Sequence, residues 1–368
     1  MKRQPRPESY SIPSPLVVSP YQSGSCSQFV ESVSDKTTKS IMTMELLLHQ
    51  GRFSEAADAV HNVGMPSNIL EAACIDLYRI LLCMRDGNHS LATAIQQNFV
   101  QNVPDARVAK LVRTSIEACA DPQTEGPRFI AHVKECHRYL AHLSGILVGE
   151  PGCEKRAAQP SETGDTAMGS LMACIDAYRA TQAGDYAYAC GICDAIRSLT
   201  AHQHPLLNAY ALIIQSASLM HCGRETDAQR LYLQAFEILD ADKLYLPLGI
   251  AYAFSCGLPE ACLRKPYRRE YKAMSAIYKS FVAGYAKAHA KLPFAPLLTT
   301  DQLALLSPLE ASVACLAATN RSNAGIAQFL GCTSHTVKYH LANIYSKLGI
   351  SRRTELRPHP FGTHFDGA

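Results

Sequence analysis

Apolar residues recur at helical spacing along most of the chain. From residue 29 to residue 290 they return every three or four positions, with little of the strict alternation that marks a β-strand. A rhythm of strand, helix and strand is also missing from this stretch of sequence. The pattern predicts an all-α protein whose long central part is built from packed helices.

A weak internal repeat runs through this helical region. Glycines end four of the apolar segments, and an alanine follows each glycine five positions later. The pairs are Gly51 with Ala56, Gly87 with Ala92, Gly184 with Ala189, and Gly223 with Ala228. A glycine turn followed by a small residue lets two helices approach closely, as in stacked helical hairpins. The region resembles a degenerate tetratricopeptide-type array, so we expect residues 29–290 to form a helical-repeat body.

Three shorter helical patterns follow near the C-terminus. Ser307, Pro308 and Glu310 have the spacing of a capping box with a proline at the first helical position. A second helix is expected after Ser322 and a third after Thr333, because each hydroxyl side chain can cap a helix. Each of these two helices then meets a glycine, which favours a tight end.

The third of these helices is amphipathic. Its apolar residues lie at i, i+4, i+7 and i+11 and therefore share one face: Val337, Leu341, Ile344 and Leu348. The opposite face carries His335, Lys338, Tyr339 and Ala342. Two short helices, a tight turn and a third helix with a polar, basic outer face predict a helix-turn-helix unit. Such a third helix fits the major groove of DNA.

Residues 306–356 resemble the LuxR-type (GerE-type) DNA-binding domain. The resemblance rests on residues that keep the family's spacing without a gap: Leu306-Ser307, Glu310, Val313, Ser322-Asn323, Ile326-Ala327, Leu330-Gly331, Thr336-Val337-Lys338, His340-Leu341, Asn343-Ile344, Lys347-Leu348-Gly349 and Arg353-Thr354. It implies a four-helix DNA-binding domain that usually works as a dimer in bacterial transcription control.

The resemblance also implies which residues contact DNA. His335, Lys338 and Tyr339 occupy the groove-reading positions of the matched motif and are expected to meet base edges. Five further residues are expected to contact phosphate or to support the local structure: Thr336, His340, Asn343, Lys347 and Arg353.

The sequence departs from the family pattern at three places. Gly325 stands where the family usually has a glutamate, which removes a capping partner for Ser322. Ala342 occupies a groove-facing position that is often polar in the family. Pro358 and Pro360 limit a fourth helix beginning near Arg353 to little more than one turn, and this helix often supports the dimer contact.

The chain is therefore expected to divide into five parts. These are a disordered tail (1–28), the helical-repeat body (29–290, with a Gly- and Pro-rich break at 149–169), a linker (291–305), the DNA-binding domain (306–357) and a C-terminal tail (358–368).

Charge is concentrated at the C-terminus. The whole chain has a formal net charge of +3, and residues 301–357 hold six Lys or Arg against three Asp or Glu. The remainder is neutral overall, which suits a DNA-contacting domain on a neutral body and not a protein that coats nucleic acid along its length. The polar N-terminus and the lack of a long apolar run predict a cytoplasmic protein without membrane contact, whose fourteen cysteines are reduced.

Other chemistry has weaker support. The sequence carries no phosphate-binding loop, receiver-domain pattern or nucleophile–base constellation, so we expect no enzyme, cofactor or metal. Cys190 and Cys193 form a C-x-x-C inside a helical segment, where two packed thiols are favoured over a thiol or metal sensor. Histidines 202, 204 and 221 crowd one stretch and could suggest metal binding, but His202 and His204 flank a loop before Pro205, where solvated turn histidines are favoured. The basic stretch 264–271 is favoured as a solvated helix face.

These observations favour a LuxR-type transcriptional regulator. The expected partners are double-stranded promoter DNA, RNA polymerase, an unidentified signal ligand or protein on the body, and a second copy of the chain on DNA. The alternative is a helical-repeat scaffold for protein interactions, with a C-terminal bundle that does not read DNA. The outer face of the third helix discriminates between them, because a scaffold has no need of Lys338.

Overall fold

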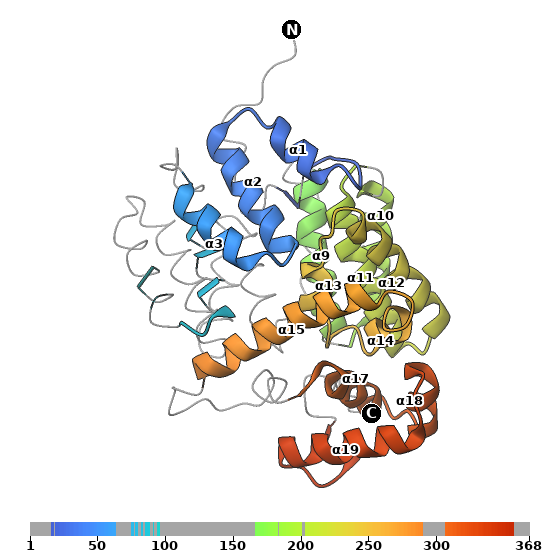
Figure 1. Ribbon diagram of the computed structural model, residues 1–368. Helices are drawn as coiled ribbons and strands as arrows, with labels where there is room; N and C mark the ends of the chain where they lie inside the picture. The colour runs from blue at the N-terminus through green and yellow to red at the C-terminus, as the bar shows by residue number, and fades with distance from the viewer. Residues whose placement is uncertain are drawn as a thin grey trace.

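The computed structural model describes residues 16–63, part of 75–95, 166–289 and 306–356, with single positions left out of these ranges. Every regular element in the described residues is a helix, as the hydrophobic spacing predicts (Figure 1). The protein is all-α. The predicted linker, the C-terminal tail, Ala92, His202 and most of the predicted break lie outside the described residues.

The first helical hairpin follows a short leading helix. The elements are α1 (Cys26–Ser32), α2 (Lys36–His49) and α3 (Phe53–Asn62). Asp35 caps α2, since its carboxylate accepts the Thr38 N–H at 2.7 Å. Gly51 turns the chain between α2 and α3 with a φ of +75°, and a β-carbon there would lie 2.9 Å from Ile277 Cδ1. Glycine is therefore required for both the turn and the close approach.

The expectation of a disordered tail through residue 28 does not hold from residue 16 on. Leu16 is fully buried, and its backbone N–H donates to the carboxylate of Glu45 at 2.7 Å. Glu45 is itself fully buried and also accepts the hydroxyl of Tyr78. A buried carboxylate needs such donors, and the N-terminal segment supplies one of them. Composition alone could not reveal this long-range bond.

A second set of four helices forms the larger part of the body. These are α9 (Thr166–Gln182), α10 (Tyr186–Thr200), α11 (Pro205–His221) and α12 (Glu225–Asp240). Gly184 and Gly223 turn the chain with φ of +83° and +74°. Ala189 and Ala228 are fully buried at the helix contacts that follow. The glycine–alanine pattern thus marks two helical hairpins, α9–α10 and α11–α12, as the sequence predicts.

Helix α11 is the centre of this set. It packs against α9, α10 and α12, and nearly all its residues are buried. Even its polar residues Ser216 and Ser218 are fully covered. Their hydroxyls donate hydrogen bonds to backbone carbonyls of the same helix, Ser216 to Ile213 and Ser218 to Ile214. A helix that is apolar on all sides is stable only when other helices cover every side, which explains the central position of α11.

Three further helices lead from the body toward the C-terminus. They are α13 (Leu246–Ile250), α14 (Leu258–Cys262) and the long α15 (Arg268–His289). Figure 1 shows α15 crossing the lower side of the body, above α17 and α19. Ile277 of α15 fits over Gly249, where a β-carbon would come within 2.6 Å of it. None of the helices in the described ranges is long and apolar enough to cross a membrane.

Candidate nucleic-acid interface

The C-terminal domain begins with the predicted capping box. Helix α17 (Pro308–Ala318) has Ser307 at its N-cap. The Glu310 N–H donates to Ser307 Oγ at 3.3 Å, and the Ser307 N–H donates to Glu310 Oε2 at 2.8 Å. Two backbone donors that a helix start leaves unpaired are thereby satisfied. The start of the domain is fixed by local sequence alone.

The next two helices form a helix-turn-helix. Helix α18 (Asn323–Leu330) is capped by Ser322, and α19 (Ser334–Leu348) is capped by Thr333. Gly331 joins them in the left-handed region with a φ of +63°. The Gly325 N–H donates to Ser322 Oγ at 3.1 Å, so the cap forms without a glutamate at this position. What is lost is only the second bond of a capping box, from the Ser322 N–H to a glutamate side chain. These bounds agree with the sequence prediction.

Helix α19 has two opposed faces. Val337, Leu341, Ile344 and Leu348 are all buried against the other helices of the domain. Lys338 and His335 are exposed on the other side, and 60% of Tyr339 is open to solvent. The three predicted base-reading side chains therefore stand together on the free face of the helix.

Three further polar residues of α19 are less open. Thr336 is half-buried, its N–H donates to Thr333 Oγ1 at 3.1 Å, and the two hydroxyls are 2.9 Å apart. His340 and Asn343 are also half-buried. Burial lowers the pKa of His340, so that its imidazole is neutral near neutral pH. Its Nδ1 has no hydrogen-bond partner among the described residues.

Lys347 and Arg353 have partners inside the domain. Lys347 Nζ lies 2.7 Å from Oε2 of Glu310. Arg353 donates to the carbonyl of Ala317 at 3.1 Å, to Asn323 Oδ1 at 3.0 Å and to the carbonyl of Arg321. Both side chains thus connect the end of the domain to its beginning. This is the support of local structure that the sequence analysis named as an alternative to phosphate contact. Their contact with DNA stays a prediction.

The fourth element is as short as the two prolines predict. It is a single 3-10 turn, Arg353–Leu356, and Leu356 is fully buried under α17. Arg353 holds this turn in place through its three bonds. The turn therefore closes the domain core, and within the described residues up to 356 it adds no long outer helix for a second copy to contact.

The domain is joined to the body through α17 and α18. Ser312 of α17 donates to the buried carboxylate of Glu260 at 2.7 Å. Arg321 forms an ion pair with Glu225 at 2.7 Å. Gly257 of the body lies so close to Leu316 that a β-carbon would come within 3.0 Å of it. The body thus holds the side of the domain opposite to the free face of α19.

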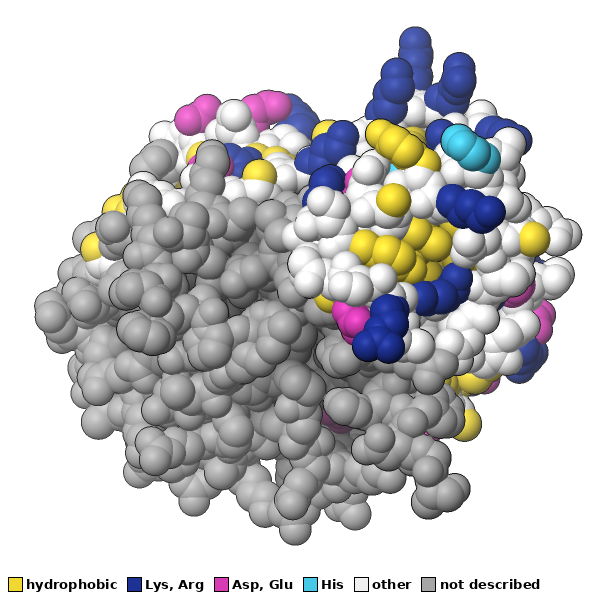
Figure 2. All heavy atoms as spheres, turned by 90° about the horizontal axis from the view of Figure 1, so that it is seen from below, with side chains coloured by type: hydrophobic (Ala, Val, Ile, Leu, Met, Phe, Trp, Pro, Cys, Tyr) yellow, Lys and Arg dark blue, Asp and Glu magenta, His cyan; other side chains and the backbone are white. Residues whose placement is uncertain are grey.

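A basic surface extends from the domain onto the body. Helix α19 is the lowest helix in Figure 1, and Figure 2 views the molecule from that lower side. Lys and Arg side chains gather on the face that Figure 2 shows. Lys265 of the body contributes to it, because its Nζ lies 3.3 Å from the place that a β-carbon of Gly331 would take. Arg264, Lys265, Arg268 and Arg269 are all exposed. Tyr267 packs on Phe236, with ring centroids 4.6 Å apart.

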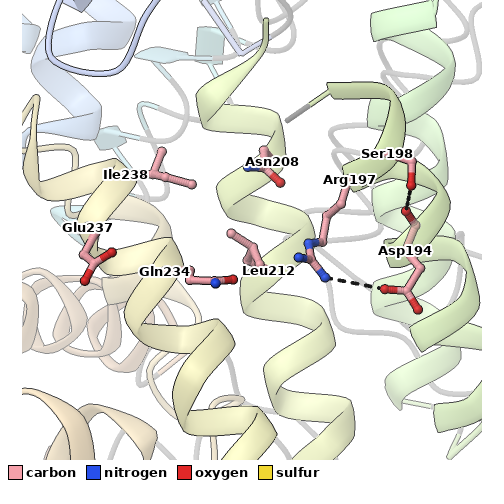
Figure 3. Close-up of a pocket in the computed structure, with 8 residues that line it drawn as sticks. All are labelled: Asp194, Arg197, Ser198, Asn208, Leu212, Gln234, Glu237 and Ile238. Atoms are coloured by element: carbon pink, nitrogen blue, oxygen red, sulfur yellow. Dashed lines mark hydrogen bonds and ion pairs between the residues drawn. The ribbon is translucent and has the colours of Figure 1, made fainter. Parts of the chain in front are cut away.

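A separate groove lies on the body between α10, α11 and α12. It has a volume of about 610 Å³, and Figure 3 shows the eight side chains that line it. Arg197 forms one wall, donating to Gln215 at 2.9 Å, and Gln215 donates to Asp194 at 2.8 Å. Asn208 is 7% exposed, and its Oδ1 has no hydrogen-bond partner in the described part of the chain. A buried acceptor of this kind is free to receive a ligand's donor.

The C-x-x-C thiols lie within α10 and are not positioned for reactivity. Burial raises the pKa of Cys190 to about 11 and the pKa of Cys193 well above its usual range. Both thiols therefore stay protonated near neutral pH, which is the state of an inert thiol. The expectation that all cysteines are reduced does not hold elsewhere, because Cys256 and Cys315 form a disulfide at the junction of the body and α17.

The arrangement of α17, α18 and α19 defines a helix-turn-helix domain, a class that places its last helix in a DNA groove. Residues 304–357 match the family model described as bacterial regulatory proteins, luxR family. The C-terminal domain of this chain is a LuxR-family helix-turn-helix domain, as the resemblance in its sequence indicates.

The comparison with known proteins matches only a limited part of the chain. The chain is similar to a probable transcriptional regulatory protein, SgaR, of Hyphomicrobium methylovorum, with 38% identity over 74 residues. The match spans 20% of this chain and 35% of SgaR, so the chain covers about a third of that relative's length. No solved structure matches the chain.

Proposed function

We propose that this protein is a DNA-binding transcriptional regulator that reads promoter DNA with α19 and receives a signal through its helical body. The observation that carries the proposal is the pair of opposed faces on α19. The helix buries Val337, Leu341, Ile344 and Leu348. It leaves His335, Lys338 and Tyr339 open on the side away from the body. A free, basic helix face at the edge of a LuxR-family domain is what groove reading requires.

In this proposal the contacts divide into two kinds. Lys338 donates to guanine acceptors, while Tyr339 and His335 contact neighbouring base edges. Lys265 of the body, which borders the turn between α18 and α19 at Gly331, and the exposed Arg264 next to it in sequence meet phosphates beside the reading helix. The first kind sets sequence preference, and the second adds affinity that depends on salt.

We expect Lys338→Ala to weaken binding to a preferred site by about 1–3 kcal/mol, because it removes a base contact. Binding to random DNA should change far less. The measurement is a fluorescence anisotropy titration of full-length protein against a site recovered from genomic fragments by pull-down with the same protein. Lys265→Ala is the matched control, since losing a phosphate contact should weaken both DNAs equally and reduce the salt slope by about 1. An unchanged preference in Lys338→Ala would remove this residue from the reading role.

The proposal includes a homodimer on DNA and contact with RNA polymerase. One short domain with few charges gives limited affinity, and two half-sites would double the contacts. Because the fourth element is a single turn, the dimer contact would have to come from other surfaces of the chain. The stoichiometry of the same titration tests this, with two chains expected per site. We assign no enzymatic reaction, and we place the protein in the cytoplasm with the DNA that it reads.

We further propose that the groove between α10, α11 and α12 takes the signal, a small polar molecule that donates a hydrogen bond to Asn208. The supporting observation is the unpaired Oδ1 at the groove wall. The network of Arg197, Gln215 and Asp194 is already formed, so the wall is held in shape before a ligand arrives.

Asn208→Leu should therefore raise the free energy of unfolding of the ligand-free protein by on the order of 1 kcal/mol, because it removes a buried unpaired acceptor at similar volume. Gln215→Leu is the control and should lower stability, since it breaks the bonds to Arg197 and Asp194. Urea unfolding followed by circular dichroism measures both. If Asn208→Leu were the more damaging change, Oδ1 would have a role in holding the fold and not in receiving a ligand.

The scaffold alternative makes a different prediction for the same protein. A scaffold would bind DNA without sequence preference, and Lys338→Ala would then act no differently from Lys265→Ala. The exposed position of Lys338 and Tyr339 favours the regulator.

A further inference from the structure

Three potential metal ligands meet where the body contacts the DNA-binding domain. His221 ends α11, Cys256 follows α13, and Cys315 lies in α17. Their ligand atoms all lie within 4.8 Å of one another, and His221 Nε2 is 3.4 Å from Cys256 Sγ. The residues are separated by up to 94 positions in sequence, so only the fold brings them together. In the described part of the chain, no second group of three such donors lies as close.

The two cysteines are well covered, whereas the histidine reaches an edge of the junction. Cys256 is 2% exposed and Cys315 is 1% exposed. His221 is half-buried and stacks on Tyr186, with ring centroids 4.8 Å apart and planes inclined by 2°. The stacking fixes the plane of the imidazole, so that Nε2 points to the sulfur pair. The imidazole is therefore already oriented for a bond from Nε2 to a metal ion beside the sulfurs.

The spacing of the donors fits a thiophilic metal ion once the sulfurs are reduced. Zinc lies about 2.3 Å from a thiolate and about 2.0–2.1 Å from an imidazole nitrogen. Around a tetrahedral centre these bond lengths put two sulfurs roughly 3.8 Å apart and a sulfur and a nitrogen roughly 3.5 Å apart. The observed 3.4 Å between His221 Nε2 and Cys256 Sγ already meets the second distance. The Cα atoms of Cys256 and Cys315 are 5.4 Å apart, so side-chain rotation can provide the first.

We propose that Cys256, Cys315 and His221 form a zinc site that joins the body to the DNA-binding domain when the disulfide is reduced. A solvent molecule supplies the fourth ligand from the side on which His221 is open. Two thiolates and one Zn²⁺ are neutral together, so the buried part of the site carries no net charge. The nearby Arg321 has its own partner in Glu225 at 2.7 Å.

The chemistry balances with a cellular thiol as reductant. Two small thiols give up two electrons and two protons to the Cys256–Cys315 bond and become one disulfide, leaving two protein thiols. Zinc binding then releases the two thiol protons to solvent. Disulfide and metal are alternative links across the same junction. In the reduced, metal-free protein the polar contacts that remain there are Ser312 with Glu260 and Arg321 with Glu225.

The test is a cobalt titration of the full-length chain. The protein is reduced with a phosphine, stripped with a chelator, desalted without oxygen and titrated with Co²⁺. We expect one equivalent to bind, with a thiolate-to-cobalt charge-transfer band and the visible bands of a tetrahedral centre, and Zn²⁺ should displace it. Cys315→Ser and Cys256→Ser should each lose these bands. The double variant Cys190→Ser/Cys193→Ser is the matched control and should keep them.

A second measurement covers the case in which a serine variant fails to fold. X-ray absorption at the zinc edge of the wild-type protein should show two sulfur ligands and one imidazole nitrogen with one oxygen. A four-sulfur site would overturn the proposal. So would bands that survive in Cys315→Ser, bands lost in the control variant, no cobalt uptake by the reduced wild type, or a Cys256–Cys315 bond that the phosphine fails to open.

Discussion

Replacing Ile344 by alanine is expected to lower the free energy of unfolding by about 2–5 kcal/mol, the cost of deleting a fully buried aliphatic side chain. Ile344 is 0% exposed and faces the other helices of the C-terminal domain. A loss of this size is a large part of the total stability of a protein domain. DNA affinity should fall with it, because α19 is then no longer held against α17 and α18.

Tyr339→Ala is the matched control on the opposite face of the same helix. Tyr339 is 60% exposed, so its removal should change stability by no more than about 0.5 kcal/mol. Its DNA affinity should nevertheless fall, because the residue stands beside Lys338 on the free face. Urea unfolding and anisotropy titration of the two variants separate the two effects. Equal losses of stability would mean that α19 is not packed in the way the structure shows.

The second large effect is expected at Glu260, the buried carboxylate between body and domain. It is 3% exposed and accepts hydroxyl donors from Tyr252, from Tyr271 at 3.3 Å and from Ser312 at 2.7 Å. Glu260→Leu should leave the hydroxyls of Ser312 and Tyr271 without this acceptor, at about 1–3 kcal/mol for each one that stays buried and unpaired. The Tyr252 hydroxyl can still donate to the Tyr271 hydroxyl, which lies 2.9 Å away. Glu260→Gln keeps an acceptor oxygen and should cost less. A leucine variant as stable as the glutamine variant would show that the hydroxyls find other partners.

Glu260 should also make stability depend on pH. Burial raises the pKa of Glu260 above its ordinary value, although the bonds from Tyr252 and Ser312 act in the opposite direction. The folded protein therefore holds the proton more tightly than the unfolded chain does. The stability that this group contributes is greatest below the ordinary glutamate pKa and is lost as the pH rises through the raised value. Wild type should lose stability relative to Glu260→Gln over that interval, and parallel profiles would contradict the assignment.

Local sequence was sufficient to predict the C-terminal domain. Ser307 with Glu310, Ser322 and Thr333 are caps whose partners lie three residues away, so the helix starts follow from short-range chemistry. The opposed faces of α19 follow from its apolar spacing in the same way. The glycine turns at 184 and 223 were also visible, because a left-handed turn and a buried alanine leave a local mark on the sequence.

The contacts that join distant segments were not predictable. The bond from Leu16 to Glu45 spans 29 residues, and the bond from Ser312 to Glu260 spans 52. Neither pair has a sequence spacing that indicates contact, so the N-terminal segment was expected to be a tail and the junction was not expected at all. The cluster of His221, Cys256 and Cys315 was missed for the same reason. Cys190 and Cys193 were visible as a possible site because they are three positions apart, whereas the three residues of the cluster are up to 94 positions apart.

The face that α17 turns toward the body has a consequence for hybrid proteins. Ser312, Cys315 and Leu316 lie on this face and meet Glu260, Cys256 and Gly257. The DNA-binding domain therefore cannot be exchanged for another without changing its contact with the body. A chimera that fuses this body to the reading domain of another regulator would have to carry those three α17 residues with it, or the fused halves would meet without matching surfaces.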